Sequence, residues 1–408
     1  MTTVPTSRAP ADTPSRSSAW TVFLVFLRLG LSSFGGPVAH IGYFRAEFVE
    51  RRRWLDERSF SDLVSLCQFL PGPASSQVGI AIGLARAGWR GSIAAWLGFT
   101  MPSALLLVAF GYGMSVYGGI AGSGAVHGLK VAAVAVVAQA VWGMAKTLCP
   151  DLARAGLAIF AALLTLALPS SAGQVGVILA CGLAGYALLK LPHLPPAAHA
   201  GCGVSRRAGA LALAAFFLLL AGLPMLASAT GSTAAGVFAD FYRAGALVFG
   251  GGHVVLPLLQ AAVVPGGLVS NADFLAGYGA TQAVPGPLFT FAAYLGTVMT
   301  APFGGWTGGL ACLAAIFAPA WLVVVGALPF WEALRQRDGI QSALAGVNAG
   351  VVGLLLAALY DPVWTSAIHS RADFGLALAA FGLLVVARVS PVAVVALSAL
   401  AGWGLTVV

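Results

Sequence analysis

Charged residues are scarce in this sequence, and acidic residues are missing from the interior of its long apolar segments. Only 8% of the 408 residues are charged and 59% are hydrophobic, whereas about 25% of the residues of a soluble domain are charged. Several apolar runs exceed the roughly 18 residues that indicate a membrane span. No Asp or Glu lies deep in such a run, with Glu47 and Asp62 the nearest. We therefore expect an all-α polytopic membrane protein in the lipid bilayer, with little support for a carboxylate proton relay.

Paired cysteines are also lacking. The five cysteines form no Cys-x-x-Cys pair and most lie in apolar segments, so the sequence predicts no disulfide framework and no metal site. The histidines are scattered and no cofactor-binding pattern is visible, which argues against an enzyme embedded in the membrane. We expect no cofactor.

The net charge of +8 does not require an acidic partner. Basic residues gather on the cytoplasmic loops of membrane proteins, and the chain has no soluble domain with a basic face, so no nucleic acid is expected. Residues 1–18 are rich in Thr, Ser, Pro and Ala and include two arginines. They lack the apolar core and cleavage site of a signal peptide, and we expect a disordered cytoplasmic tail.

Two Pro-Gly-Pro sequences interrupt apolar segments. Pro71-Gly72-Pro73 follows Gln68, and Pro285-Gly286-Pro287 follows Gln282 at the same spacing. Proline removes a backbone N–H and clashes with the preceding turn of a helix. Broken membrane segments at matching places in two halves of a chain point to a transport site.

The second half of the chain repeats the first. Phe34-Gly35-Gly36 aligns with Phe249-Gly250-Gly251, and the two Pro-Gly-Pro sequences align with few gaps between them. Pro102 then aligns with Pro319, and Gly128 with Gly346. We expect a tail at 1–18, a first repeat at 19–190, a linker with an inverting transmembrane helix at 191–228, and a second repeat at 229–408.

Loop charges predict that the two repeats are inverted. The 45–58 loop carries five arginines, whereas the matching 263–273 segment carries no Lys or Arg, so the first is expected to be cytoplasmic and the second external. Because the tail is also expected inside, each broken segment should turn back as a re-entrant hairpin, giving two hairpins per repeat followed by transmembrane helices. Full crossings, with about 13 spans, remain the alternative.

The breaks predict an anion site. A broken helix exposes backbone N–H groups and the positive end of its dipole, and nearby hydroxyls and amides can donate hydrogen bonds. The alternative is that the glycines and prolines only let helices pack closely. The candidate substrate-binding residues at the breaks are Ser33, Gly35, Gly36, Gln68, Pro71, Gly72, Pro73, Ser75, Ser76, Gly250, Gly251, Gly252, His253, Gln282, Pro285, Gly286, Pro287 and Thr290.

Arg28 and Arg243 are a matched pair of cations within apolar segments. An ionisable residue inside the membrane is a functional candidate, and the arginine fork suits an oxyanion. Alternatively, each arginine snorkels or pairs locally with Asp62 or Asp240. His253 could donate to an anion or carry a proton, or be a buried structural histidine.

These motifs carry a family resemblance. The Phe34–Gly42 segment, Gln68–Ser76, Phe249–His253 and the second Pro-Gly-Pro resemble the chromate ion transporter (CHR) family in its long two-domain form. The resemblance covers nearly the whole chain except the tail and the 190–207 linker. It implies a multi-pass bacterial inner-membrane protein that exports chromate from the cytoplasm, driven by the proton motive force, and that also handles the isosteric sulfate.

The resulting functional prediction is secondary active export of chromate by alternating access at a site near the midplane. Protons are the expected coupling ion, the N-terminus is expected in the cytoplasm, and a homodimer is considered as the oligomeric state. The alternatives are an oxyanion channel and a sulfate-type oxyanion transporter that is not specific for chromate.

Overall fold

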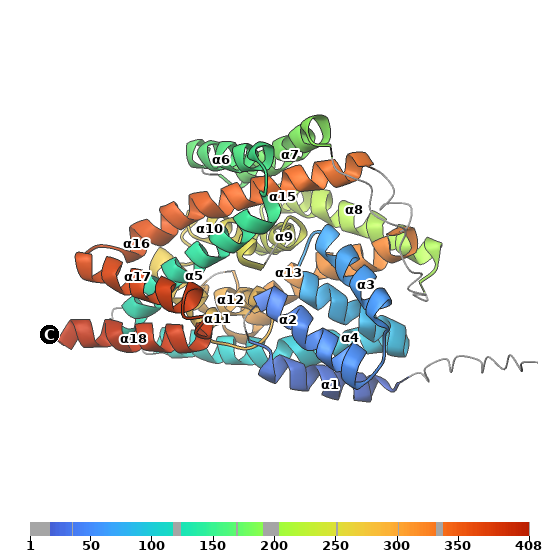
Figure 1. Cartoon of the computed structure of the whole chain (residues 1–408), viewed down its shortest axis with the longest axis horizontal. Coiled ribbons are helices and arrows are strands. Elements are labelled where there is room, and N and C mark those ends of the chain that lie inside the picture. Colours follow the sequence, from blue (N-terminus) through green and yellow to red (C-terminus); the bar gives the residue numbers. More distant parts are fainter. Residues whose placement is uncertain are drawn as a thin grey trace, which may run out of the picture.

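The protein is described by a computed structural model that covers residues 17–34, 36–116, 124–168, 170–190, 204–249, 252–300, 302–331 and 338–407. Regular secondary structure in these ranges is helical throughout, as the sequence predicts (Figure 1). The predicted tail and linker fall mostly outside these ranges. The boundaries of the predicted units stay predictions.

The first repeat consists of short helices followed by long ones. Its helices are α1 (Ala19–Ser32), α2 (Gly36–Arg45), the π-helix η1 (Ala46–Arg51), α3 (Glu57–Phe69), α4 (Ala74–Val116), α5 (Gly124–Leu148), α6 (Leu152–Ala167) and α7 (Ser171–Leu188). Within α4, Ala87 and Gly88 leave helical angles, so α4 is a short arm ending at Arg86 and a long helix beyond it.

The same order recurs in the second repeat after the connecting helix α8 (Arg206–Thr230). Its elements are α9 (Thr233–Ala246), η3 (Gly252–Val254), α10 (Val255–Val263), α11 (Asn271–Gln282), η4 (Leu288–Thr290), α12 (Phe291–Val298), α13 (Gly305–Ala327), η5 (Leu328–Phe330), α15 (Asp338–Ala358), η6 (Leu359–Trp364), α16 (Thr365–Ala367), α17 (Arg371–Val385) and α18 (Pro391–Val407).

The first broken segment folds back on itself as a hairpin. The ring of Phe26, in α1, lies 5.6 Å from the ring of Phe44 and 5.1 Å from the ring of Phe48. Phe44 and Phe48 come after the break, so the returning arm lies beside the arm that entered. All three rings are fully buried, and this aromatic contact holds the two arms together.

Both hairpins of the first repeat open at the same end of the molecule. The guanidinium of Arg86, at the end of the second hairpin, lies 5.0 Å from the ring centre of Trp54 in the loop between the hairpins. It also donates to the hydroxyl of Ser17, just before α1, at 3.2 Å. The start, the middle and the end of this region therefore meet at one place, which agrees with the predicted re-entrant arrangement.

The hairpins of the second repeat open at the opposite end. Trp306, at the start of α13, donates its backbone N–H to the hydroxyl of Tyr112 at 3.0 Å. Tyr112 is near the far end of α4, whereas Trp89, which aligns with Trp306, is near the first repeat's opening. The two tryptophans are therefore separated by the length of α4, about 35 Å at 1.5 Å per residue, and the repeats are inverted relative to each other.

The long helices of the two repeats exchange partners. Helices α6 and α7 pack against α15, and α17 and α18 pack against α5 (Figure 1). Glycines allow these close approaches: a Cβ on Gly346 would lie 2.1 Å from the backbone oxygen of Cys181, and one on Gly128 would lie 2.0 Å from that of Ser398. Small residues serve this purpose in membrane helix packing, and the exchange makes the two repeats one interlocked unit.

Five helical stretches in the described ranges are long and apolar enough to cross a membrane. They are Ala74–Met114, Gly124–Leu148, Arg206–Thr230, Gly305–Phe330 and Gly339–Ala367. Shorter apolar helices accompany them, including α1, α6 and α7. Together with the inverted repeats, they make the chain a multi-pass membrane protein.

Candidate functional site

A cavity of about 630 Å³ lies where three of the broken tips meet the C-terminal half of α5. We call it the α5 cavity. It is lined by the tips at Gly36, Pro37, Gly252, His253, Thr281, Gln282, Val284, Gly286 and Leu288, by Val136, Gln139, Ala140, Gly143, Met144 and Thr147 of α5, and by Leu384, Arg388, Val389, Ser390 and Pro391 around the α17–α18 turn.

The lining of the α5 cavity suits an anion. Arg388 lies in the α17–α18 turn at its edge and is exposed. The other polar side chains of the lining are hydroxyls, amides and the imidazole of His253, and the lining includes no Asp or Glu. A bound anion would therefore meet a positive charge and hydrogen-bond donors without a repelling carboxylate.

Gln282 offers an unused donor in this cavity. Its side-chain nitrogen is buried and makes no hydrogen bond within the described parts of the chain. A buried polar group without a partner is costly, so a ligand that accepts from this nitrogen would recover free energy. The neighbouring His253 is instead engaged, because its Nδ1 lies 2.6 Å from the hydroxyl of Tyr278.

The broken tips are joined across the two repeats by backbone hydrogen bonds. The N–H of Gly72 donates to the carbonyl of Val248 at 2.7 Å, and the N–H of Gly286 donates to the carbonyl of Ser33 at 2.9 Å. Ser33 and Val248 occupy the same place in the repeat, directly before the aligned Phe-Gly-Gly. Each Pro-Gly-Pro therefore binds the glycine break of the other repeat.

His40 strengthens one of these junctions. Its Nε2 lies 3.2 Å from the carbonyl oxygen of Ser33, and because a carbonyl only accepts, Nε2 donates. In the neutral ring Nδ1 then accepts from the hydroxyl of Ser75, at 3.2 Å. His40 is 1% exposed, so it fixes the tips from within the protein.

The tips meet beside the prolines in the middle of the long helices. A Cβ on Gly72 would lie 3.4 Å from the Cβ of Ala320, next to Pro319. A Cβ on Gly286 would lie 2.8 Å from the hydroxyl of Ser103, next to Pro102. Because Pro102 and Pro319 lie near the centres of their helices, the junctions lie near the middle of the span.

The structure brings together part of the set of residues predicted from the sequence. Gly36, Gly252, His253, Gln282 and Gly286 all line the α5 cavity. The flanking Pro285 and Pro287 are buried beside it. Three further candidates, Gly35, Gly250 and Gly251, lie outside the described residues.

The first Pro-Gly-Pro does not line this cavity. Gly72 and Pro73 are buried and Pro71 is half-buried, and the carbonyl of Pro71 accepts a 2.7 Å hydrogen bond from the side chain of Gln77. Gln68 points outward and is exposed on α3. Sequence reasoning selected Gln68 for its symmetry with Gln282 and missed Gln77, which has no polar counterpart in the second repeat.

The predicted hydroxyl donors are buried near the tips. Thr290 donates back to the carbonyl of Pro287 at 2.7 Å, and Ser75 pairs with His40. The hydroxyls of Ser33 and Ser76 are buried and make no hydrogen bond within the described ranges. These hydroxyls belong to the tip region without being part of the cavity lining.

The matched arginines lie away from the α5 cavity. Arg28 is exposed on α1, and Arg243 forms an ion pair with Asp240, one turn earlier on α9. Neither is among the lining residues. The local pairing of Arg243 corresponds to the alternative considered from the sequence, and a binding role for the two arginines stays a prediction.

Arg388, Gln139 and Thr147 line the cavity and were not predicted from the sequence. Arg388 was counted only as a cytoplasmic charge, because its place in the repeat is taken by the uncharged Ser170 in the first half. Gln139 and Thr147 lie on α5 without a break or a repeated motif to mark them. The one available signal was the rarity of polar residues in apolar segments.

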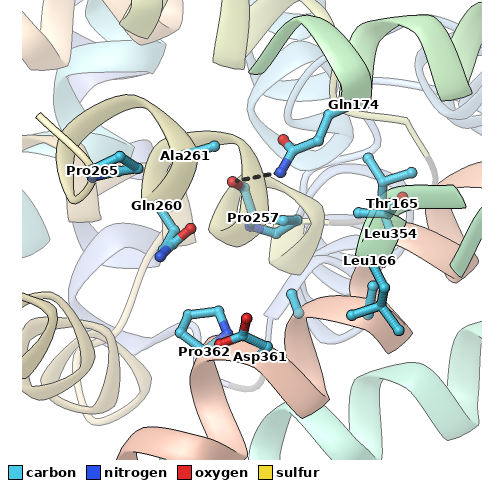
Figure 2. Close-up of a pocket in the computed structure, with 12 residues that line it drawn as sticks. Thr165, Leu166, Gln174, Pro257, Gln260, Ala261, Pro265, Leu354, Asp361 and Pro362 are labelled. Carbon is cyan, nitrogen blue, oxygen red and sulfur yellow. Dashed lines mark hydrogen bonds between the residues drawn. The ribbon is translucent and has the colours of Figure 1, made fainter. Parts of the chain in front are cut away.

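A second, smaller pocket of about 240 Å³ lies beside α15 (Figure 2). We call it the α15 pocket. In the register that pairs Gly128 with Gly346, its five α15-side residues match five of the six α5 residues that line the first cavity. It is lined by Leu354, Ala357, Ala358, Asp361 and Pro362, by Thr165, Leu166 and Gln174 of α6 and α7, and by Pro257, Gln260, Ala261 and Pro265 around α10.

Comparison with known proteins identifies relatives along almost the whole chain. The family model described as "Chromate transporter" matches residues 20–186 and again residues 235–403. A chromate transport protein of Pseudomonas aeruginosa is 32% identical over 394 residues, covering 94% of this chain and 91% of the relative. A chromate transport protein of Cupriavidus metallidurans is 26% identical over 364 residues, covering 86% of each chain. No solved structure matches.

The double match agrees with the internal repeat found in the sequence and with the two inverted halves of the structure. The family is one of transporters and not of enzymes, and it supports a role in chromate transport. This chain belongs to the chromate transporter family.

Proposed function

We propose that this protein is a secondary active transporter that exports chromate from the cytoplasm, with the α5 cavity as its substrate site. The observation that carries the proposal is the lining of that cavity: three broken helix tips, an arginine and an unpartnered amide donor, with no carboxylate. A doubly charged tetrahedral oxyanion needs such a set of donors. Sulfate has the same shape and charge, and we propose that it is accepted too.

The charge distribution sets the proposed orientation. The α5 cavity is lined by Arg388 of the α17–α18 turn and by the C-terminal half of α5, whose last turn carries Lys146. The five-arginine loop lies at the openings of the first repeat's hairpins. Positive loops mark the cytoplasmic side. The α5 cavity would then face the cytoplasm, the N-terminus would be cytoplasmic, and the membrane would be the bacterial inner membrane.

The two repeat-related spaces support alternating access. The α5 cavity has about 630 Å³ and the α15 pocket about 240 Å³, and the inverted repeats support the proposal that the two spaces face opposite sides of the membrane. Inverted repeats commonly exchange conformations during transport. We propose that the state described is open to the cytoplasm, and that export proceeds when the α5 cavity closes and the opposite side opens. Protons are the proposed coupling ion.

Counterflow separates this proposal from an oxyanion channel. Liposomes with the purified full-length chain are loaded with unlabelled chromate and diluted into labelled chromate without any ion gradient. A transporter exchanges one for the other, and the label transiently exceeds its equilibrium level. A channel lets the label only equilibrate. Failure to move chromate at all, with sulfate moved instead, would favour a sulfate-type oxyanion transporter.

A further inference from the structure

The α15 pocket is related to the α5 cavity by the repeat, but its polarity is reversed. In the register that pairs Gly128 with Gly346, Asp361 takes the place of Gly143 and Ser170 takes the place of Arg388. The α15 pocket therefore gains a carboxylate and lacks the arginine. Its lining includes no Lys or Arg. The α15 pocket is therefore acceptor-rich where the repeat-related α5 cavity is donor-rich.

Gln174 supplies a second, independent observation. It is 5% exposed, and its side-chain nitrogen donates to the carbonyl of Pro257 at 3.4 Å (Figure 2). That bond assigns the two ends of the amide. The side-chain oxygen is buried and has no hydrogen-bond partner in the described ranges. A buried acceptor without a donor is costly, and here it is part of the lining of a pocket that also holds a carboxylate.

The remaining polar groups of the pocket are compatible with the same ligand. The hydroxyl of Thr165 donates to the carbonyl of Ala161 at 2.7 Å, so its lone pairs remain available as acceptors. Figure 2 shows Gln260 to the left of Pro257 and Asp361 below it, and both residues line the pocket. Carboxylate, amide and hydroxyl oxygens are ligands for hard cations.

We propose that the α15 pocket binds a small monovalent cation, either Na⁺ or a proton, with the Asp361 carboxylate as the charged ligand and the Gln174 oxygen as a further acceptor in the lining. The role of the cation as coupling ion rests on the proposed transport function. The binding of the cation rests on the lining of the α15 pocket alone. Transporters of inverted-repeat architecture place coupling-ion sites at such helix interruptions.

Helix α10 connects the α15 pocket to the α5 cavity. The tip that precedes it, Gly252–His253, lines the α5 cavity, while Pro257 and Gln260 of α10 itself line the α15 pocket. Gln174 holds α10 directly through the carbonyl of Pro257. A cation drawn to Gln174 and Asp361 would act on the same short helix that presents the tip to the anion. This contiguous contact provides a physical route for coupling.

Cation binding to the purified full-length protein tests the proposal without any transport step. The melting temperature is measured in sodium chloride and in choline chloride of equal concentration, and then in choline chloride at decreasing pH. A ligand that binds only the folded state raises the melting temperature. We expect sodium, or in the proton case acidification from about pH 8 to about pH 6, to raise it by about 2 °C or more in the wild type. This range lies above the pH at which protonation of Glu47 lowers stability.

Two variants locate the effect. In Asp361→Asn the increase should disappear, and in Gln174→Leu it should shrink. The matched control is Asp151→Asn, which also removes one carboxylate from a helix boundary but keeps the N-cap of α6, because asparagine caps as well as aspartate. The control should respond to cations as the wild type does.

The outcomes are distinguishable. A sodium-specific increase lost in Asp361→Asn supports a Na⁺ site, and a pH-dependent increase lost in the same variant supports a proton site. No cation response in the wild type, or a response that Asp361→Asn retains, would overturn the proposal. If the cation response is present but the protein moves no oxyanion, the proposed function fails and the cation site stands.

Discussion

The backbone N–H of Gly72 lies 2.7 Å from the carbonyl oxygen of Val248, so the Pro-Gly-Pro of one repeat is bonded to the glycine break of the other. Gly286 and Ser33 form the mirror contact at 2.9 Å. These bonds satisfy backbone groups that a broken helix would otherwise leave unpaired inside a membrane. The four tips are therefore a single structural unit, and perturbing one tip should be felt in both repeats.

Substitution of the Pro-Gly-Pro glycines tests this unit. Gly286 has φ +105°, and a Cβ there would lie 2.8 Å from the hydroxyl of Ser103. Gly286→Ala should therefore cost about 1–3 kcal/mol and strongly reduce transport. Gly266→Ala is the control, because that glycine lies in open space. An unchanged melting temperature and transport rate in Gly286→Ala would contradict the role of the tip.

Arg388 should contribute directly to oxyanion affinity. Charge-assisted hydrogen bonds contribute about 1.5–3 kcal/mol, so Arg388→Gln should raise the KM for chromate about tenfold with little change in melting temperature. Arg371→Gln is the matched control, because Arg371 is also exposed but lies at the other end of α17. Equal KM values for Arg388→Gln and Arg371→Gln would remove Arg388 from the site.

Substituting the matched arginines predicted from the sequence, Arg28 and Arg243, should not raise the KM for chromate, in contrast to Arg388→Gln. If the α5 cavity is the substrate site, Arg28→Ala should leave the KM for chromate unchanged, because Arg28 is exposed on α1 and does not line the cavity. Arg243→Ala should mainly lower stability, because it leaves the half-buried Asp240 without its partner. A tenfold rise in KM for both variants would restore the arginine pair to the site.

The loop between the first two hairpins should lose stability in acid. Burial alone would raise the pKa of the Glu47 carboxyl, but hydrogen bonds from Arg52 and Arg51 outweigh burial and hold this pKa below its ordinary value. A lowered pKa stabilises the fold above the unfolded-state pKa, and the stabilisation is lost as pH falls through the folded-state pKa. The wild-type melting temperature should therefore fall more than that of Glu47→Gln between pH 6 and about pH 3.

Glu57→Gln is the control for this experiment, because it removes an exposed carboxylate from the same region. Plotted against pH, the melting temperatures of the wild type and of Glu47→Gln should converge at the acidic end. Parallel curves over the whole range would show that the Glu47 ion pairs do not contribute.

Much of the architecture could be predicted from the sequence because the breaks are chemically conspicuous. Proline and glycine at Pro71–Pro73 and Pro285–Pro287 cannot belong to a plain membrane helix, and their repetition identified the two halves and pointed to a transport site at the breaks. The loop arginines predicted the inversion. Trp54, Arg86 and Ser17 lie together at one end of the molecule. This agrees with the sequence prediction, because the loop arginines had placed these segments on one side of the membrane.

The exchange of helices between repeats could not be predicted in this way. The apolar faces of α6, α7, α17 and α18 resemble one another, so hydrophobicity alone does not select α5 or α15 as the partner. The α5 cavity shows the same limit: Arg388 comes from a turn far along the chain, and only the exchanged packing of α17 and α18 on α5 brings it to the tips. A residue without a counterpart in the other repeat cannot be selected by comparing the two repeats.

The most direct test of the central claim is chromate uptake by inside-out membrane vesicles, measured with and without an imposed proton gradient. We expect vesicles with an acidic interior to accumulate chromate above the external level, sulfate to compete, and collapse of the gradient to abolish accumulation. Arg388→Gln vesicles should accumulate less at low chromate concentrations. Vesicles that never accumulate chromate, or that take it up equally with the gradient collapsed, would contradict proton-coupled export.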